Sequence, residues 1–398
     1  MIDYSSLLSE KVQEIKPSGI RKFSELAAEM GNVISLGVGE PDFQTPWAIR
    51  QAGIESLERG RTHYSPNAGF RELKQEIDRY LERRMGLSYS EEETMVTIGG
   101  SEAIDMMIRA VIDPGDEVLI PEPCYVSYDP IARLTGAKVV SIPTRFEDDF
   151  RLTAEALKAA ITPKSKLLIF PYPNNPTGGI MEREDLEAIA EVLRDTNILV
   201  LSDEIYAELT YGGKKHVSIA SIVGMRERTI VVNGFSKTYA MTGWRLGYAV
   251  GPAPLIREMI KIHQFAIMCA PTTSQLAAVE ALRSCDEEIE AMRDEYDMRG
   301  KYLVGELNRI GLECFQPQGA FYVFPSIRRT GLSSEEFCER LLREERVAVI
   351  PGSAFGGWGE GHIRISYCYS LQHLKIAVRK IEKFLKKLER EKHENGQG

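Results

Sequence analysis

The chain has 398 residues, of which 43% are hydrophobic and 27% are charged, and its net charge is −9. A chain of this length is expected to divide into two domains, since single hydrophobic cores rarely grow past about 250 to 300 residues. The negative charge argues against nucleic acid as the main partner, because binding a phosphate backbone needs a basic surface.

Membrane segments, signal peptides and metal sites leave no pattern in this sequence. No stretch reaches the roughly 18 apolar residues of a transmembrane helix, and Met1-Ile2-Asp3-Tyr4 begins without the basic and then apolar pattern of a signal peptide. We therefore expect a cytoplasmic protein with no membrane partner. The cysteines have neither a Cys-x-x-Cys pair nor a His at ligand spacing, which favours free thiols. They are Cys124, Cys269, Cys285, Cys314, Cys338 and Cys368.

The N-terminal part begins with a short expected strand at Val33–Leu36. The loop after it, Gly37-Val38-Gly39-Glu40-Pro41, lacks the third glycine of a dinucleotide-binding loop, so the residues alone favour a plain turn. Helical patterns at Trp47–Arg59 and Gly69–Met85 flank a turn-rich segment that contains Tyr64. The Tyr64 ring either packs over this loop or reaches a neighbouring chain.

Strands and helices alternate from Thr94 to Ile262, as in a doubly wound parallel sheet. The strand Thr94–Ile98 runs into Gly99-Gly100-Ser101-Glu102, which opens a helix. Free N–H groups and the positive end of the helix dipole suit an anion there, although such a turn is also a common helix cap. After the next strand, Glu117–Pro121, the ring of Tyr125 is placed to stack on a flat ligand or to join the core.

Polar residues follow two further strands. The strand Lys166–Phe170 ends in a proline-rich loop whose Asn175 amide is a candidate donor to a ligand oxygen. The wholly apolar strand Ile198–Leu201 leads to Asp203, with Tyr206 about one helical turn later. A carboxylate at the end of a buried strand needs a cationic partner, unless it caps a helix.

Lys237 is the strongest catalytic candidate. It follows the apolar run Thr229–Val232 and an Asn-Gly break, next to Ser236. Burial among small and apolar residues favours the neutral amine, which attacks a carbonyl to form a Schiff base. Arg245, eight residues later, has a planar fork suited to a phosphate. Taken alone, a lysine here would be interpreted as a solvated surface residue.

The C-terminal part begins with a long charged helix at Asp286–Arg309. Strands are then expected at 312–315, 320–324, 347–350 and 362–366, and helices at 333–343 and 371–390. In the last strand Ile363 and Ile365 face one way and Arg364 faces the other. An arginine there is either a surface ion-pair partner or a carboxylate ligand.

The segment Val231–Tyr248, with its Ser-Lys-Thr and Gly-Trp-Arg-Leu-Gly strings, resembles the lysine-bearing signature of the fold-type I pyridoxal-phosphate enzymes, in the class I aminotransferase family. The Asn-Asn-Pro-Thr-Gly string that ends at Gly178 is a second mark, and the resemblance covers nearly the whole chain. It implies an α/β fold, in which a large domain holds a doubly wound, mostly parallel sheet and a smaller α+β domain is built from both termini. The expected limits are 1–45 and 286–398 for the small domain and 46–285 for the large one.

The resemblance also assigns the site. It implies that pyridoxal 5'-phosphate binds covalently to Lys237, which then moves a proton to and from the substrate, while Asp203 lies at the ring nitrogen. Arg364 and the Gly39 backbone are expected at the substrate carboxylate, and Ile20 at the substrate side chain. The other expected cofactor contacts are Gly100, Ser101, Glu102, Tyr125, Asn175, Tyr206, Ser236 and Arg245, with Tyr64 from the second subunit of a homodimer.

The implied activity is transfer of an amino group from an L-amino acid to a 2-oxo acid such as 2-oxoglutarate. Segments 18–23 and 63–67 are most similar to the branch that holds aromatic and N-acetyl-diaminopimelate aminotransferases, whose members are often labelled aspartate aminotransferases. The apolar Ile20 argues against a dedicated aspartate site, but dual specificity stays open.

Two alternative functions remain open. A β-eliminating lyase of the same fold would share Lys237, Asp203 and Arg245. A cofactor-sensing regulator without turnover is more remote, because such regulators carry a DNA-binding module ahead of this domain, and only about 30 residues precede the first strand here.

Overall fold

A seven-stranded sheet with the order β2-β8-β7-β6-β5-β3-β4 forms the centre of the molecule. The computed structural model describes residues 2–17 and 19–395, so Ser18 of the 18–23 segment lies outside the described residues, as do Met1 and 396–398. Strand β8 runs antiparallel to β2 and β7, and the other neighbours are parallel. The predicted mostly parallel α/β sheet is therefore confirmed. Its strands are β2 (Thr94–Thr97), β3 (Glu117–Glu122), β4 (Lys138–Pro143), β5 (Ser165–Phe170), β6 (Leu199–Asp203), β7 (Thr229–Gly234) and β8 (Gly247–Val250).

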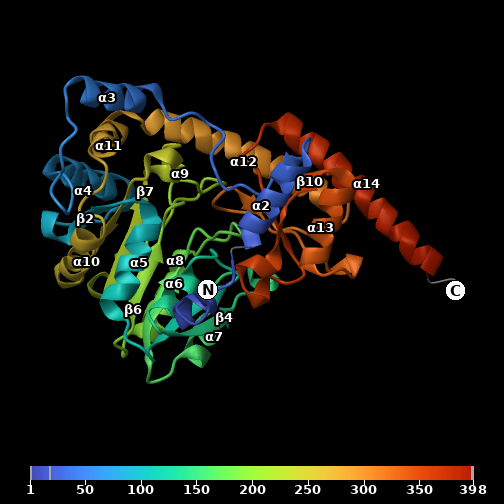
Figure 1. The fold of residues 1–398 in the computed structure, drawn as a ribbon, viewed down its shortest axis with the longest axis horizontal. Coiled ribbons are helices and arrows are strands. Elements are labelled where there is room, and N and C mark those ends of the chain that lie inside the picture. The colour runs from blue at the N-terminus through green and yellow to red at the C-terminus, as the bar shows by residue number, and fades with distance from the viewer. Residues whose placement is uncertain (1, 18, 396–398) are drawn as a thin grey trace.

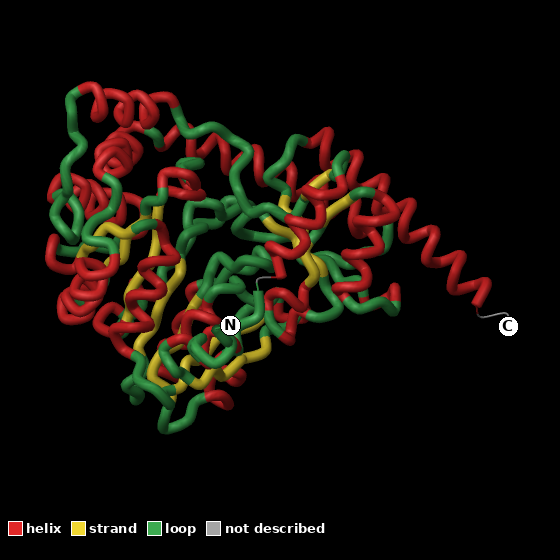
Figure 2. The backbone as a smooth tube through the Cα atoms, in the orientation of Figure 1, coloured by secondary structure: helices red, strands yellow, loops and turns green. Residues whose placement is uncertain are grey.

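Helices cover both faces of this sheet (Figure 1), and Figure 2 shows the yellow strands between layers of red helices. In β3, Val118 and Ile120 pack in the cluster that includes α5, whereas Leu119 packs with α8 on the other face. A strand covered on both sides has no polar face, which explains the continuous apolar runs seen in the sequence. The helices of this part are α3 (Trp47–Glu58), α4 (Arg71–Met85), α5 (Gly99–Val111), α6 (Tyr128–Leu134), α7 (Ala154–Ala160), α8 (Arg183–Leu193), α9 (Phe235–Thr238), α10 (Ala253–Ala266) and α11 (Thr272–Ser284).

The long helix α12 (Asp286–Arg309) leads from the large sheet to a second group of elements (Figure 1). Strands β11, β12 and β9 form an antiparallel sheet there, and β1 pairs in parallel with β10, so both ends of the chain build this part. The domain limits given above stay a prediction. The elements are α1 (Glu10–Gln13), α2 (Gly19–Met30), β1 (Ile34–Ser35), β9 (Tyr322–Val323), α13 (Ser334–Glu345), β10 (Val347–Ala348), β11 (Ile350–Pro351), β12 (Ile363–Ser366) and α14 (Leu371–Asn395).

Residues 312–315 form no regular element, so the strand expected there is wrong. The side chain of Asn308 provides the physical reason. Its Nδ2 donates to the carbonyl of Cys314 at 2.9 Å and its Oδ1 accepts from the Cys314 N–H at 3.0 Å. The backbone of Cys314 is thus satisfied without a neighbouring strand. The closing helix α14, expected to end near residue 390, continues to Asn395.

In the part of the chain that the structure describes, no helix is both long and apolar enough to span a bilayer. These residues also contain no group of His, Cys, Asp and Glu side chains suited to a metal ion. All six cysteines are free thiols, and every one except Cys269 is buried.

Candidate active site

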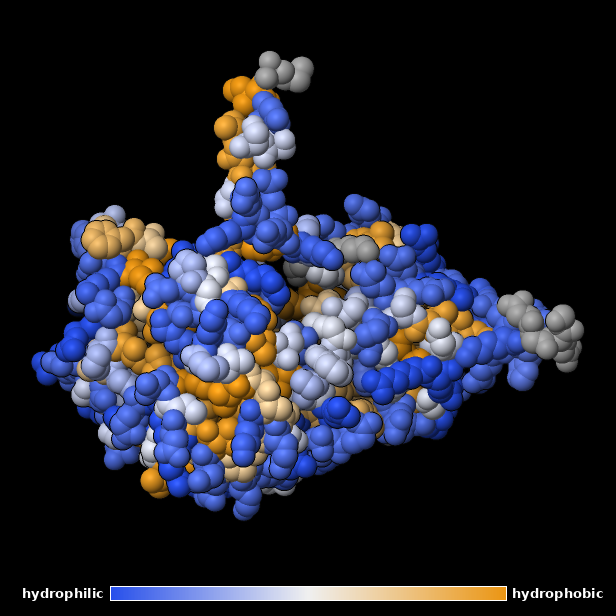
Figure 3. Space-filling view, turned by 90° about the horizontal axis from the view of Figure 1, so that it is seen from below, coloured by the Kyte–Doolittle hydropathy of each residue, from blue (hydrophilic) through white to orange (hydrophobic). Residues whose placement is uncertain are grey.

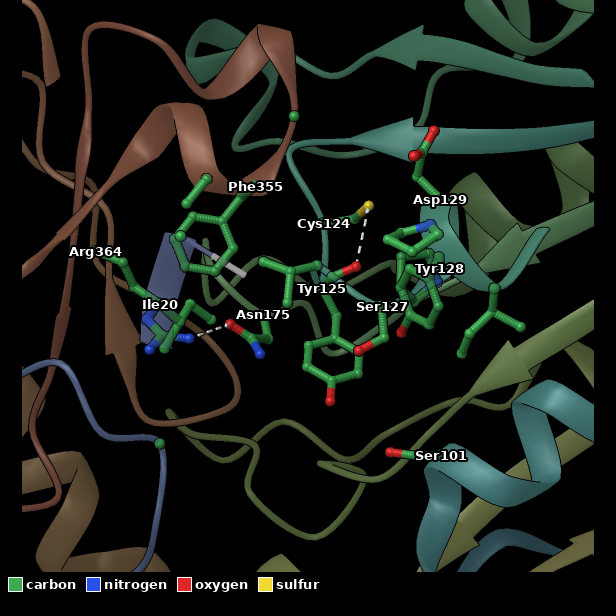
Figure 4. A pocket seen from close by; sticks show the side chains of 18 of the residues that line it. Ile20, Ser101, Cys124, Tyr125, Ser127, Tyr128, Asp129, Asn175, Phe355 and Arg364 are labelled. Carbon is green, nitrogen blue, oxygen red and sulfur yellow. Dashed lines mark hydrogen bonds between the residues drawn. The ribbon is translucent and has the colours of Figure 1, made fainter. Parts of the chain in front are cut away.

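A cleft of about 1490 Å³ lies where the carboxyl ends of the parallel strands meet the C-terminal elements. This edge of an open α/β sheet is the usual place for a ligand. Figure 4 shows Ile20, Arg364 and Phe355 on one side of the cleft, Ser101 on the other, and Tyr125 between them. The predicted site residues that line it are Ile20, Gly39, Gly100, Ser101, Tyr125, Asn175, Asp203, Tyr206, Ser236, Lys237, Arg245 and Arg364.

Lys237 enters the cleft from α9, directly after β7. Its Nζ donates a hydrogen bond of 2.6 Å to the carbonyl of Gly39. Burial, which disfavours the ammonium form, lowers the pKa of Lys237 from 10.5 to about 8. The amine is therefore much easier to deprotonate than a surface lysine, as a nucleophile for a carbonyl has to be.

Asp203 ends β6 and is buried at the cleft. The hydroxyl of Tyr128 donates to its Oδ2 at 2.7 Å, and the N–H of Ile205 donates to its Oδ1 at 3.2 Å. Burial raises the pKa of Asp203, and no Lys, Arg or His among the described residues forms an ion pair with it. A buried carboxylate without a cation fits a ligand that brings its own positive charge, such as a protonated ring nitrogen.

An anion-binding corner lies at the N-terminus of α5. Gly99 has a φ of 72°, and a Cβ added there would lie 2.7 Å from Nη2 of Arg245, so the guanidinium lies directly against the turn. Nη1 of Arg245 donates to the carbonyl of Thr242 at 3.0 Å. The first N–H groups of α5, at Gly100 and Ser101, have no acceptor within their own helix. Together with the helix dipole and Arg245 they suit a phosphate.

Two predicted cofactor residues do not line the cleft. The Glu102 carboxylate accepts from the N–H of Ile98 at 2.5 Å and bonds Nδ1 of His263 at 2.7 Å. Its charge would repel a phosphate, so only the backbone N–H of Glu102 remains for that prediction. Tyr64 is 80% exposed, and its predicted contact with the cofactor would have to be made in a second chain's cleft.

Arg364 reaches the cleft from β12 and is only 2% exposed. Its Nη1 donates to Oδ1 of Asn175 at 2.9 Å and its Nη2 to the carbonyl of Gly37 at 2.5 Å, which leaves the amide Nδ2 of Asn175 for another acceptor. The guanidinium lies 4.5 Å from the Tyr322 ring and 4.8 Å from the Phe355 ring. Nε is buried without a partner among the described residues, and a substrate carboxylate would satisfy it.

Three residues that line the cleft were not predicted as site residues from the sequence: Tyr128, Tyr322 and Phe355. The Tyr322 hydroxyl shares a hydrogen bond of 2.9 Å with that of Tyr206, and a Cβ added at Gly39 would lie 2.0 Å from it. A signal existed for two of them. Tyr128 follows Tyr125 by three residues, and Tyr322 lies within an apolar strand, where a tyrosine hydroxyl needs a partner.

Comparisons with known proteins identify the family. The aminotransferase class I and II model matches residues 31–381. An aspartate aminotransferase from Pyrococcus abyssi is 46% identical over 384 residues, which are 95% of this chain and 98% of that protein. A probable N-acetyl-LL-diaminopimelate aminotransferase from Bacillus subtilis is 43% identical over 382 residues, or 96% of each chain. An aromatic aminotransferase structure from Pyrococcus horikoshii matches with a TM-score of 0.88 and 45% identity, covering 92% of this chain and 99% of that one.

The chain therefore belongs to the class I and II aminotransferase family, with the fold-type I architecture. It is an aminotransferase, as the sequence resemblance predicted.

Proposed function

We propose that this aminotransferase uses pyridoxal 5'-phosphate to move the amino group of an L-amino acid to a 2-oxo acid such as 2-oxoglutarate. The observation that carries the proposal is that Lys237 and Asp203 face one cleft from the ends of the neighbouring strands β7 and β6. One is an amine with a lowered pKa, and the other is a buried carboxylate that pairs with no Lys, Arg or His in the described part of the chain. An aldehyde on a ring with a basic nitrogen would engage both.

The remaining cleft residues fit the rest of that cofactor. The α5 turn and Arg245 would hold the phosphate, and Tyr125 would cover the ring face. The amide Nδ2 of Asn175 and the hydroxyl of Tyr206, which also bonds Tyr322, would reach the phenolic oxygen. When bound, the cofactor withdraws electrons from the substrate α-carbon and so makes its C–H bond acidic.

The chain itself supplies orientation and proton transfer. Arg364 would take the substrate carboxylate through its unpartnered Nε, which fixes the α-carbon relative to Lys237. The Lys237 amine, once released from its bond to the cofactor, would accept the α-proton at Nζ and return it to the cofactor side. Gly39 would contribute its backbone beside the carboxylate.

The amino donor is proposed to be of the aromatic, N-acetyl-diaminopimelate or aspartate class. Ile20 packs against the cluster that includes Tyr322 and Phe355, so the wall of the cleft near Arg364 is apolar. Relatives that are 43% to 46% identical to this chain are named as aspartate, aromatic or N-acetyl-diaminopimelate aminotransferases. These names support a class of amino donors and do not single out one substrate.

We also propose a homodimer in which Tyr64 reaches the partner's cofactor phosphate. The Tyr64 loop is tied to residues 268–272, because Asn67 donates to the Met268 carbonyl at 2.7 Å and Thr272 to the His63 carbonyl at 2.6 Å. Phe265, three residues before Met268 in the chain, is 88% exposed. The N-terminal arm projects from the body (Figure 3), and its apolar side chains Ile2, Tyr4, Leu7 and Leu8 are exposed. Exposed apolar surface of this kind favours association with another chain.

Purified protein assayed with aspartate, phenylalanine, tyrosine and N-acetyl-diaminopimelate, each with 2-oxoglutarate, tests the activity and ranks the donors. Lys237→Ala should lower transfer at least about a hundredfold and abolish the visible absorbance of the lysine–cofactor bond. Lys261→Ala, an exposed lysine on α10, is the matched control and should change neither. Full transfer by Lys237→Ala would refute the proposal. Release of pyruvate and ammonia from cysteine conjugates without an acceptor would show a lyase instead.

A further inference from the structure

Tyr128 connects two separate strand ends at the cleft. It opens α6, in the segment that follows β3, whereas Asp203 ends β6, and β5 lies between these strands. The Tyr128 hydroxyl donates to Oδ2 of Asp203 at 2.7 Å, and both side chains are buried. A hydroxyl that donates to a buried carboxylate makes a charge-assisted bond, which is stronger than a neutral one.

A second buried tyrosine–carboxylate pair shows what is missing at the cleft. The Tyr80 hydroxyl donates to Oε1 of Glu208 at 2.5 Å, but Arg84 also pairs with that carboxylate. Protein side chains thus balance the charge of Glu208. At Asp203 the tyrosine is present and no described side chain supplies the cation, so a cationic group of a ligand in the cleft would complete the pairing.

The two hydrogen bonds to the Asp203 carboxylate orient it but do not use all of its acceptor capacity. Within the described residues, Oδ1 accepts only the N–H of Ile205, at 3.2 Å, and Oδ2 only the Tyr128 hydroxyl. Each carboxylate oxygen accepts about two hydrogen bonds, so both keep acceptor capacity. The Tyr125 and Tyr128 rings make a T-shaped contact, with centroids 5.5 Å apart and planes at 83°, which helps to hold the Tyr128 ring in place.

We propose that Tyr128 is a positioning residue that acts through Asp203, keeping this carboxylate ionised and oriented toward the ring nitrogen of pyridoxal phosphate. The inference rests on the proposed function, because it presupposes that cofactor. Burial and the charge of Asp203 raise the pKa of Tyr128, so its hydroxyl keeps its proton and donates. The same bond opposes the effect of burial on the pKa of Asp203.

The test uses apoprotein titrated with pyridoxal phosphate and with the analogue in which a C–H group replaces the ring nitrogen. Tyr128→Phe removes only the hydroxyl and should weaken pyridoxal phosphate binding roughly tenfold or more, while binding of the analogue changes less than about twofold. In an Asp203→Ala background the same substitution should cause no further loss. Tyr80→Phe, which also removes a hydroxyl from a buried carboxylate, should lower thermal stability and leave both affinities unchanged.

Binding of pyridoxal phosphate by the wild-type apoprotein tests the proposed function, and the behaviour of Tyr128→Phe tests the role of Tyr128. If the wild-type apoprotein does not bind pyridoxal phosphate, the proposed function fails. If it binds, and Tyr128→Phe weakens the cofactor and the analogue equally, Tyr128 contacts the ligand elsewhere and the inference is overturned. Unchanged affinity for both in a folded Tyr128→Phe protein overturns it as well.

Discussion

The amine of Lys237 donates to the backbone carbonyl of Gly39, 2.6 Å away, although the two residues are 198 positions apart in the chain. The bond joins the end of the large sheet to the loop after β1. Any side chain on Gly39 would enter the space held by the Tyr322 hydroxyl, so this backbone can approach the lysine only at a glycine. The amine of Lys237, the proposed nucleophile, is thus held by the segment expected to contact the substrate.

Lys237 predicts a pH dependence for cofactor capture. Its pKa is lowered to about 8 by burial, and only the neutral amine attacks an aldehyde, so the capture rate of the apoprotein should rise with pH through about 8 and level off above it. Stopped-flow absorbance from about pH 6 to about pH 10 checks this. A rate that keeps rising toward the ordinary lysine value of 10.5 would contradict the burial argument.

Gly39→Ala should disturb catalysis without unfolding the protein. The added Cβ would lie 2.0 Å from the Tyr322 hydroxyl, so either the Gly39 backbone or Tyr322 has to move, and we expect kcat/KM to fall about a hundredfold. Steady-state kinetics with the best donor provide the measurement. Gly305→Ala, on the exposed side of α12 with no atom within 4 Å of the new Cβ, is the control and should leave kinetics unchanged.

Removing the Tyr322 hydroxyl tests whether this clash causes the loss of activity in Gly39→Ala. Tyr322→Phe combined with Gly39→Ala should recover part of the lost activity, because the nearest remaining atom of the ring lies 3.0 Å from the new Cβ. A double variant as poor as the product of the two single effects would show that the clash is not the reason.

Arg364→Lys should act on substrate binding more than on cofactor binding. The substitution keeps the charge but removes the planar fork and the buried Nε. We expect KM to rise and kcat/KM to fall at least about 30-fold, with the cofactor absorbance retained. Arg293→Lys, a partly exposed arginine on α12, is the matched control. An unchanged KM would place the carboxylate elsewhere.

The proposed role of Tyr64 across a dimer interface predicts complementation. Tyr64→Ala and Lys237→Ala homodimers should each be impaired, the first through weaker phosphate binding. Mixed dimers would contain one site with both native residues, so mixing the two proteins after gentle dissociation should restore activity above either parent. No recovery in a confirmed mixed dimer would mean that Tyr64 serves its own chain.

Much of the sheet, and the edge where the candidate site residues gather, followed from local patterns. Continuous apolar runs mark strands covered on both faces, and the chain direction places their ends at one edge, which is why Asn175, Asp203 and Lys237 line one cleft. The expected strand at 312–315 was wrong because a single side chain, Asn308, took the place of a strand partner. A side chain that bonds the backbone in place of a neighbouring strand leaves no periodic pattern in the sequence.

The sequence by itself determined which candidate reactive groups follow the strands and the sheet edge that carries them, because residue type and apolar periodicity are properties of short segments. Only the tertiary structure decided how those groups are held. Asp203 bonds Tyr128, 75 residues earlier, and Tyr206 bonds Tyr322, 116 residues later, while Tyr322 and Phe355 enclose Arg364. These partners come from separate elements, and a hydrogen bond or ring contact between them depends on packing distances that no local pattern encodes.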